Sequence, residues 1–199
     1  MCSAYYPHMG KGRLEAFSDG VIAILITIMV LELKTPQGFD LSALRPMIPV
    51  FLAYVLSFVV LGIYWNNHHH MFHATDRING RILWANLHLL FWLSLIPAVT
   101  AWIGATRSAP VPTAVYGAVL LMAGVAYYIL TRTIVSLLGP HSAIATAVGK
   151  DVKGIVSVVL YAAAIPLAFV SRWMADAIYV LVVLMWLVQD RRIESKLTQ

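Results

Sequence analysis

The stretch RLEAFSDGVIAILITIMVLELK, Arg13 to Lys34, decides the fold class. Its apolar run is close to the roughly 20 residues that a helix needs to cross the hydrocarbon core of a bilayer. It also holds Asp19 near its start, and a carboxylate in a hydrophobic span is costly unless it is paired, hydrogen-bonded or beside water. The stretch therefore predicts a membrane-spanning helix over about 16–33, with a candidate functional residue near its beginning.

The composition of the whole chain also indicates a membrane protein. Of its 199 residues, 60% are hydrophobic and 12% are charged, whereas about a quarter of the residues are charged in a typical soluble domain. The mean hydropathy is +0.79. These values exclude a soluble enzyme and a disordered tail, and the single cysteine, Cys2, excludes a disulfide-stapled secreted module. The formal charge of +5 is scattered between apolar runs, so we expect no nucleic-acid partner.

Five further apolar segments follow, at about 47–65, 82–104, 112–130, 154–170 and 173–188. The last two are separated only by Ser171 and Arg172. We predict a helical hairpin with its turn at Arg172, because one helix over both segments would be roughly 50 Å long at 1.5 Å per residue. The sequence thus predicts an all-α integral membrane protein with six spanning helices in one transmembrane domain, residues 1–199.

The basic residues predict the orientation. With six spans, both ends of the chain lie on one side of the membrane, and ten Lys and Arg residues fall on that side: Lys11, Arg13, Arg77, Arg81, Arg132, Lys150, Lys153, Arg191, Arg192 and Lys196. Four fall on the other side: Lys34, Arg45, Arg107 and Arg172. Because cytoplasmic loops carry the excess of positive charge, we expect both termini in the cytoplasm and the chain in the cell membrane.

The first predicted helix has one stripe of side chains that could line a pore. The stripe begins at Gly20 and continues four, seven, eight and eleven residues later, as expected for one face of a helix. Its members are Gly20, Ile24, Thr27, Ile28 and Leu31. A stripe of Ile and Leu in a membrane helix is typical of a face that contacts lipid or another helix. Spacing alone therefore leaves lipid contact, helix packing and a pore lining open.

The start of this helix carries a motif. Arg13, Phe17, Ser18, Asp19 and Gly20 form the pattern R-x-x-x-F-S-D-G ahead of a helix rich in Ile, Leu and Thr. The pattern resembles the transmembrane protein 175 family of potassium channels, in its single-repeat prokaryotic members. The resemblance thins out beyond about Gly104, and its other elements are Trp65–His69, Arg77–Asn79, Trp84, Asn86–Leu87, Pro97 and Thr100.

The resemblance implies a homotetramer in which the first helices line a central pore that conducts K+ passively. Ile24, Ile28 and Leu31 are then implied as apolar rings that form the constriction and gate, and Thr27 as a hydroxyl ring that aids selectivity. An apolar constriction can dewet and block ions. The chain has no filter sequence like TVGYG, as this family implies. K+ is the permeant ion, and we expect no cofactor and no enzymatic activity.

Ser18 and Asp19 are interpreted as supports of the pore. Polar groups at the ends of the second and third spans can satisfy a buried carboxylate, and such a network fixes helix angles. The alternative is a direct ion site at Asp19. We expect Arg13 to join this network or to meet lipid phosphate. The candidate partners of the motif are Asn66, Asn67, His68, His69, Arg77, Arg81 and Asn86.

The histidines form a second candidate site. His69 and His73 have the i, i+4 spacing of helical metal ligands, and His68 and His70 lie beside them. Because metal sites also need a third ligand and a second shell, we interpret the group as structural or interfacial and predict no metal site. A role in pH sensing is the alternative. His88, within the third span, is expected to be a hydrogen-bonded packing residue.

Two other functions are alternatives to a channel. A proton-coupled secondary transporter would relay protons through Asp19 and the histidines, but the sequence has no inverted repeat and no paired broken helices. A metal-dependent membrane enzyme would use His68, His69, His73 and Asp76. The sequence and its family resemblance favour the channel.

Overall fold

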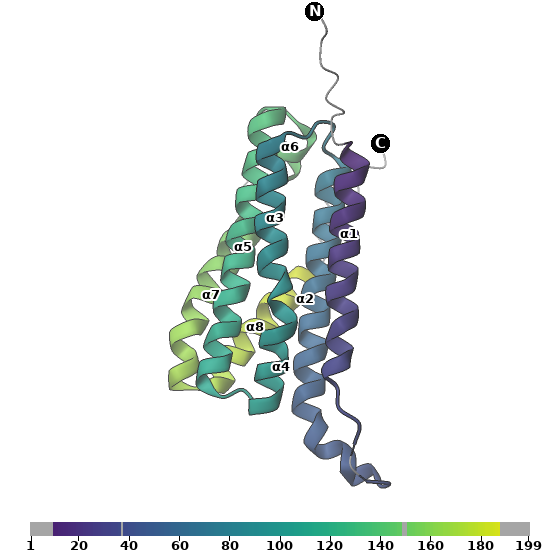
Figure 1. Cartoon of the computed structure of the whole chain (residues 1–199). Coiled ribbons are helices and arrows are strands. Elements are labelled where there is room, and N and C mark those ends of the chain that lie inside the picture. The colour runs from purple at the N-terminus through teal and green to yellow at the C-terminus, as the bar shows by residue number, and fades with distance from the viewer. Residues whose placement is uncertain (1–9, 37, 149–150, 188–199) are drawn as a thin grey trace, which may run out of the picture.

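The computed structural model describes residues 10–36, 38–148 and 151–187, and these residues form helices and no strand (Figure 1). Five helical stretches are long and apolar enough to cross a membrane: Lys11–Glu32, Leu41–His73, Gly80–Thr106, Pro110–Leu138 and Val152–Val170. A further apolar helix, α8, covers Arg172–Leu187. The prediction of an all-helical protein with several membrane-spanning helices is confirmed.

Helix α1, Lys11–Ile28, continues as a short 3₁₀ helix, η1, Met29–Glu32. Leu33 then adopts an extended conformation and ends the helical stretch. The residues that α1 buries recur every three or four positions, which places them on one face of the helix: Leu14, Ser18, Ile22 and Leu25. The helix therefore packs on the rest of the chain with one face only.

Helix α2, Ile48–His73, follows the 3₁₀ helix η2, Leu41–Met47. Pro49 lies in its first turn, where the missing amide hydrogen needs no partner. The predicted apolar span ends near residue 65, and the polar residues after it continue the same helix. At the opposite end, η2 and the first turns of α2 project beyond the other helices (Figure 1).

The third predicted span is a kinked pair of helices rather than one continuous helix. Helix α3 covers Gly80–Ser94, and helix α4 covers Ile96–Thr106. Pro97 explains the break at Leu95, because proline has no amide hydrogen for the preceding turn and its ring crowds that turn. At the start of α3, Asn79 Oδ1 accepts a hydrogen bond from the Ile82 amide at 3.0 Å. This capping contact gives α3 a defined beginning.

The second half of the chain contains helix α5, Pro110–Leu138, the short helix α6, Ala143–Val148, and the hairpin of α7, Val152–Val170, with α8. Ser171 is extended between α7 and α8, one residue before the predicted turn at Arg172, which is the first residue of α8. A Cβ atom at Gly117 of α5 would collide with the hydroxyl of Tyr179. That hydroxyl donates to the Thr113 carbonyl at 2.9 Å, and the glycine permits this close approach of α8 to α5.

The helices form a bundle in which α5 lies between the kinked α3–α4 pair and α7 (Figure 1). Helices α1 and α2 lie side by side on one side of the bundle, and α7 and α8 lie together on the other. We call the end at which α1 begins the N-terminal end of the bundle. Helices α2 and α5 end there, and α3 begins there (Figure 1).

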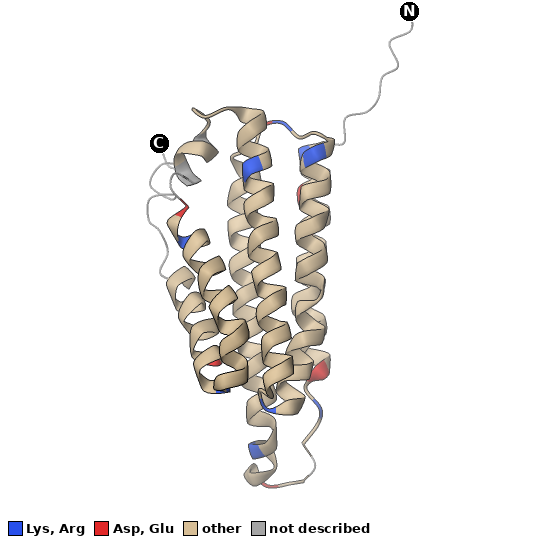
Figure 2. Cartoon of the chain, turned by 90° about the vertical axis from the view of Figure 1, so that its left-hand side faces the viewer, with Lys and Arg blue, Asp and Glu red and all other residues tan. Residues whose placement is uncertain are grey.

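Charged residues lie toward the two ends of the bundle, and the long middle of the helices in this view carries none among the described residues (Figure 2). Six basic residues predicted for the N-terminal end are described: Lys11, Arg13, Arg77, Arg81, Arg132 and Lys153. The other four, Lys150, Arg191, Arg192 and Lys196, lie outside the described residues, as does the end of the predicted sixth span. This distribution is typical of a protein that crosses a bilayer.

Candidate functional site: the exposed face of helix α1

The predicted stripe of α1 lies on the outside of the single chain. Ile24 is 60% exposed and Leu31 is 79% exposed, although both side chains are large and apolar. Gly20, Thr27 and Ile28 are also exposed. Leu31 belongs to the 3₁₀ helix η1 and not to the α-helix. Because a 3₁₀ helix has fewer residues per turn, the side chain of Leu31 is rotated away from the position that regular α-helical spacing predicts. The stripe therefore faces whatever surrounds one chain, which is lipid, another subunit or a pore.

Thr27 gives this apolar stripe its polar atom. Its Oγ1 atom lies 3.0 Å from the carbonyl oxygens of both Ala23 and Ile24. A hydroxyl has one hydrogen to donate and two lone pairs that accept. Because the hydrogen is directed to the backbone of the same helix, the hydroxyl presents an acceptor oxygen to its surroundings. This oxygen suits a cation as a ligand.

The opposite face of α1 is held by a buried polar network. Ser18 Oγ donates to the Leu14 carbonyl at 2.9 Å and accepts from Asn86 Nδ2 at 2.9 Å. Asn86 Oδ1 in turn lies 2.8 Å from His68 Nε2. Ser18, Asn86 and His68 are buried, and an unpaired member would be costly in these apolar surroundings. The network links α1, α3 and α2.

Asp19 lies beside this network but has a different partner from those expected. Its Oδ1 atom accepts a hydrogen bond from Trp65 Nε1 at 3.0 Å, whereas the sequence suggested amide, imidazole or guanidinium groups. The Trp65 ring stacks on His69 at a centroid distance of 5.9 Å, and His69 stacks on His73 at 6.2 Å. The stack was not predicted, although the i, i+4 spacing of these three rings on α2 is a sequence signal from which it could have been found.

The remaining motif residues lie on the outside of α1. Arg13 is exposed, and Phe17 is 52% exposed. A Cβ atom at Gly20 would meet no other atom within 4 Å. The structure thus brings Ser18, Asp19, His68, His69 and Asn86 into one region around α1 and α2, and it leaves Arg13, Phe17 and Gly20 facing outward.

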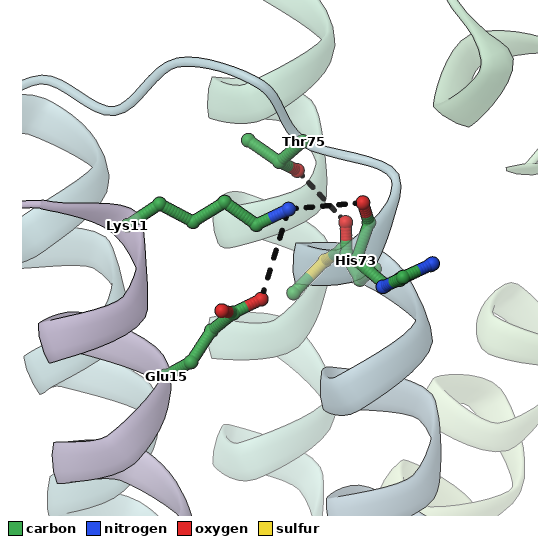
Figure 3. A network of polar contacts seen from close by, with 5 residues as sticks. Lys11, Glu15, His73 and Thr75 are labelled. Atoms are coloured by element: carbon green, nitrogen blue, oxygen red, sulfur yellow. Dashed lines mark hydrogen bonds and ion pairs between the residues drawn. The ribbon is translucent and has the colours of Figure 1, made fainter.

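Lys11 connects the beginning of α1 to the end of α2 (Figure 3). Its Nζ atom donates to the His73 carbonyl at 3.0 Å and lies 3.9 Å from Glu15 Oε1. The ion pair contributes little at this exposed position, so the bond to the carbonyl is the positioning contact. Thr75, buried in the connection to α3, donates to the Met71 carbonyl at 2.8 Å (Figure 3). Neither the contact of Lys11 nor that of Thr75 was expected from the sequence.

A second buried polar cluster ties the kinked helix α4 to its neighbours. Thr100 Oγ1 lies 2.7 Å from both Ser57 Oγ and the Ile96 carbonyl. Ser57 Oγ lies 3.0 Å from the hydroxyl of Tyr116. The cluster joins α4, α2 and α5 where the chain is buried. The family resemblance singled out Thr100, but Ser57 and Tyr116 stand in apolar runs that carry no sequence signal for this contact.

The described part of the chain contains no group of three or more His, Cys, Asp and Glu side chains that could hold a metal ion. Of the clustered histidines, His68 is hydrogen-bonded to Asn86. The rings of His69 and His73 stack on each other. His88 lies within α3, where its Nε2 atom accepts a hydrogen bond from Trp92 Nε1 at 3.0 Å.

Comparison with known proteins identifies the family. The chain is 51% identical over 191 residues to a potassium channel of Chryseobacterium sp. (strain P1-3), a match that covers 96% of this chain and 100% of that relative. Residues 13–97 match the family described as endosomal/lysosomal potassium channel TMEM175. This chain belongs to the TMEM175 family. The resemblance found in the motif is confirmed, and the chain is a multi-pass membrane protein of a family of ion channels.

Two further TMEM175 relatives are informative. The crystal structure of a lysosomal potassium-selective channel TMEM175 homolog from Chamaesiphon minutus has a TM-score of 0.80 and 29% sequence identity, and the match covers 89% of this chain and 96% of that chain. The endosomal/lysosomal proton channel TMEM175 of Danio rerio is 38% identical over 86 residues. That second match covers 36% of this chain and 16% of the fish protein.

The TMEM175 match over 13–97 begins at the motif arginine and ends in the first turn of α4. It therefore contains the stripe of α1, the Ser18–Asn86–His68 network and the bond from Trp65 to Asp19. Helices α5 to α8 lie beyond this match, although the Chryseobacterium channel aligns over nearly the whole chain. The motif-bearing helices of this TMEM175 protein are thus the ones that position the face of α1.

Proposed function

We propose that this chain is one subunit of a potassium-permeable channel and that the exposed stripe of α1 lines its pore. The observation that carries the proposal is the contrast between the two faces of α1. One face is fixed by the buried Ser18–Asn86–His68 network, and the other exposes an apolar stripe with one acceptor oxygen, at Thr27. Membership of the TMEM175 family supports it, as do relatives named as potassium channels.

One lining helix per chain requires several chains around the pore, and we propose a homotetramer. Each subunit is a single transmembrane domain, 1–199, with six spans, of which α8 is the sixth. An even number of crossings places both termini on one side of the membrane. The excess of basic residues predicted for the N-terminal end supports a cytoplasmic location of that side, with the protein in the cytoplasmic membrane.

Ions pass down their electrochemical gradient, and the pore needs no cofactor in this account. Rings of Ile24, Ile28 and Leu31 form the constriction and the gate, because narrow apolar rings can dewet. The ring of Thr27 oxygens offers ligands to a partly dehydrated K+ ion. Helix α1 keeps its angle through the buried Ser18–Asn86–His68 network and through the bond from Trp65 to Asp19. Arg13, Phe17 and Gly20 face a neighbouring subunit or lipid.

Cysteine modification tests whether α1 lines a water-accessible pathway. Cys2 is the only native cysteine, so a Cys2→Ser background carries either Thr27→Cys or the control Ile129→Cys, which is exposed on α5. A charged, water-soluble thiol reagent should change the current through the Thr27→Cys protein and leave the control unchanged. An unchanged current for Thr27→Cys, with the cysteine unmodified, would remove this face of α1 from the pathway.

The proton-coupled transporter is the alternative proposal. It would use Asp19 and the histidines of α2, and the stacked arrangement of Trp65, His69 and His73 beside the carboxylate is the observation in its favour. A transporter predicts slow, saturable K+ flux that depends on a proton gradient. A channel predicts discrete single-channel currents without any proton gradient.

A further inference from the structure

A cavity of about 240 Å³ lies between α2, α5, α7 and α8, away from the stripe of α1. Its walls are mostly apolar and include the buried residues Val60, Tyr161 and Val182. From Asp151 to Tyr161 the lining follows α7 for roughly 15 Å at 1.5 Å per residue. A dry apolar cavity of about 150 Å³ already binds a benzene molecule, so this volume accommodates a segment of a hydrocarbon chain.

The cavity opens to the outside of the bundle. Ile155 and Val159 of α7 line it and are 56% and 60% exposed, and Tyr128 of α5 also lines it and is partly exposed. This apolar surface lies on α7, on the side of the bundle opposite α1 and away from the face around which the subunits are proposed to assemble, so lipid surrounds it (Figure 1). A lipid chain can therefore reach the cavity from the side without any helix moving.

Polar groups collect at the end of the cavity toward the N-terminal end of the bundle. Asp151 lines this end, and its Oδ1 atom caps α7 by accepting from the Gly154 amide at 3.0 Å. Arg132, one turn beyond Tyr128, donates from Nε to the Tyr128 hydroxyl at 3.0 Å. The carboxylate is thus engaged at the start of α7, and the exposed guanidinium of Arg132 provides a positive charge at the height where lipid phosphates lie.

We propose that this cavity is a phospholipid site that takes one acyl chain of a lipid from the adjacent leaflet, with the phosphate beside Arg132. The apolar walls, the lateral opening and the cation at the mouth match the three parts of such a lipid. A helix of a second copy is excluded as the occupant, because a helix with its side chains is about 10 Å across. The site goes beyond the proposed conduction through α1 and is independent of it.

Photolabelling of the full chain in liposomes tests the site. The probe is a phosphatidylglycerol with a diazirine near the terminal methyl of one acyl chain, and labelled residues are mapped by mass spectrometry. Label on the buried residues Tyr161 and Val182 is expected, because lipids at the outer surface of the bundle cannot reach them. Label confined to exposed residues such as Val159 and Leu181 would overturn the proposal.

A cavity-filling variant provides the second measurement. Gly124 lines the cavity, and a Cβ atom there would make two ordinary contacts, 3.5 Å from Val158 Cγ2 and 3.9 Å from the Tyr64 hydroxyl. Gly124→Leu should therefore abolish label on Tyr161 and Val182 while label on Leu181 persists. The matched control is Gly62→Leu, at a glycine outside the cavity with no atom within 4 Å of its Cβ position; it should keep the interior label. Equal interior labelling of the two variants would refute the site.

If Gly124→Leu fails to fold, two probes that differ in the position of the diazirine within the lipid test the site in the unmodified chain. A diazirine near the glycerol end of the same chain should label residues around the mouth, such as Tyr128, and the terminal-methyl probe should label Tyr161. Identical labelling by both probes would contradict a chain that enters with its tail first. Because no current is measured, these outcomes do not depend on whether α1 conducts ions.

Discussion

At the residue scale, Thr27 is the side chain proposed to favour K+ in the pore. Its hydroxyl hydrogen is directed to the backbone of α1 and its oxygen is free to act as a ligand. Thr27→Ala removes that oxygen without adding bulk, so we expect a lower ratio of K+ to Na+ permeability. A loss of about 1 kcal/mol of preference corresponds to roughly a fivefold drop in that ratio.

The ratio for Thr27→Ala is measured from reversal potentials. Thr106 is the matched control, because it is also exposed and donates to a backbone carbonyl, that of Trp102, at 2.7 Å. Thr106→Ala should leave the ratio unchanged. An unaltered ratio in Thr27→Ala, together with normal currents, would show that the hydroxyl is not a ligand.

Ile24 is the residue proposed to form the constriction nearest to the motif. Ile24→Asn places amides in an apolar ring, which favours water there, and we expect a higher single-channel conductance with weaker ion discrimination. Ile129→Asn introduces the same change at an exposed position of α5 and should leave both properties as they are. Recordings in which the two variants behave alike would exclude Ile24 from the constriction.

Ser18 is a buried residue whose replacement should lower the stability of the protein. Ser18→Ala removes the acceptor of Asn86 Nδ2 and leaves a buried amide unpaired. We expect a loss of about 1–3 kcal/mol of stability, seen as a lower melting temperature in detergent. Ser136→Ala is the control, since Ser136 is exposed on α5. A melting temperature equal to that of the control would mean that water or a rearranged partner replaces Ser18.

At the element scale, the contact between α5 and α8 depends on Gly117. Gly117→Ala brings a methyl group into the Tyr179 hydroxyl, and we expect a loss of about 1–3 kcal/mol from overpacking. Removing that hydroxyl in Gly117→Ala/Tyr179→Phe should recover part of the loss, so thermal unfolding of the two single variants and the double variant should be non-additive. Strict additivity would show that the two side chains do not meet.

The positions of the helices followed from hydropathy, because length and apolar content dictate which segments can cross a bilayer. Their ends did not follow, because a helix can extend into polar sequence: α2 continues through His73, past its apolar run. Pro97 could have predicted the kink between α3 and α4. The apolar sequence continues on both sides of it, however, and so was interpreted as one span. The turn at Ser171 was predictable because two spans cannot fit into one helix.

The candidate site was partly predictable for a related reason. A motif identifies residues that matter, and it named Ser18, Asp19, His68 and Asn86 in advance. It does not say which atoms meet, since contacts between helices depend on how each helix is rotated and tilted. The bond from Trp65 to Asp19 and the Thr100–Ser57–Tyr116 cluster are such contacts. Both arise from packing that no local pattern encodes.

At the scale of the whole molecule, the chain has a closed side and an exposed side. Helix α5 is surrounded by α3, α4, α7 and α8, whereas α1 has neighbours on one face only. A lone chain would leave the Thr27 oxygen facing lipid, which is unfavourable. Assembly around the stripe of α1, as proposed, would place this oxygen in a hydrated pathway. Chains assembled in this way should conduct K+ selectively.

The reversal potential of the purified protein in a planar bilayer, with K+ on one side and Na+ on the other, tests this claim most directly. A K+-selective channel gives discrete current steps and a reversal potential shifted toward the equilibrium potential of K+. The absence of current steps, with K+ flux in liposomes that appears only when a proton gradient is applied, would contradict it and favour the transporter.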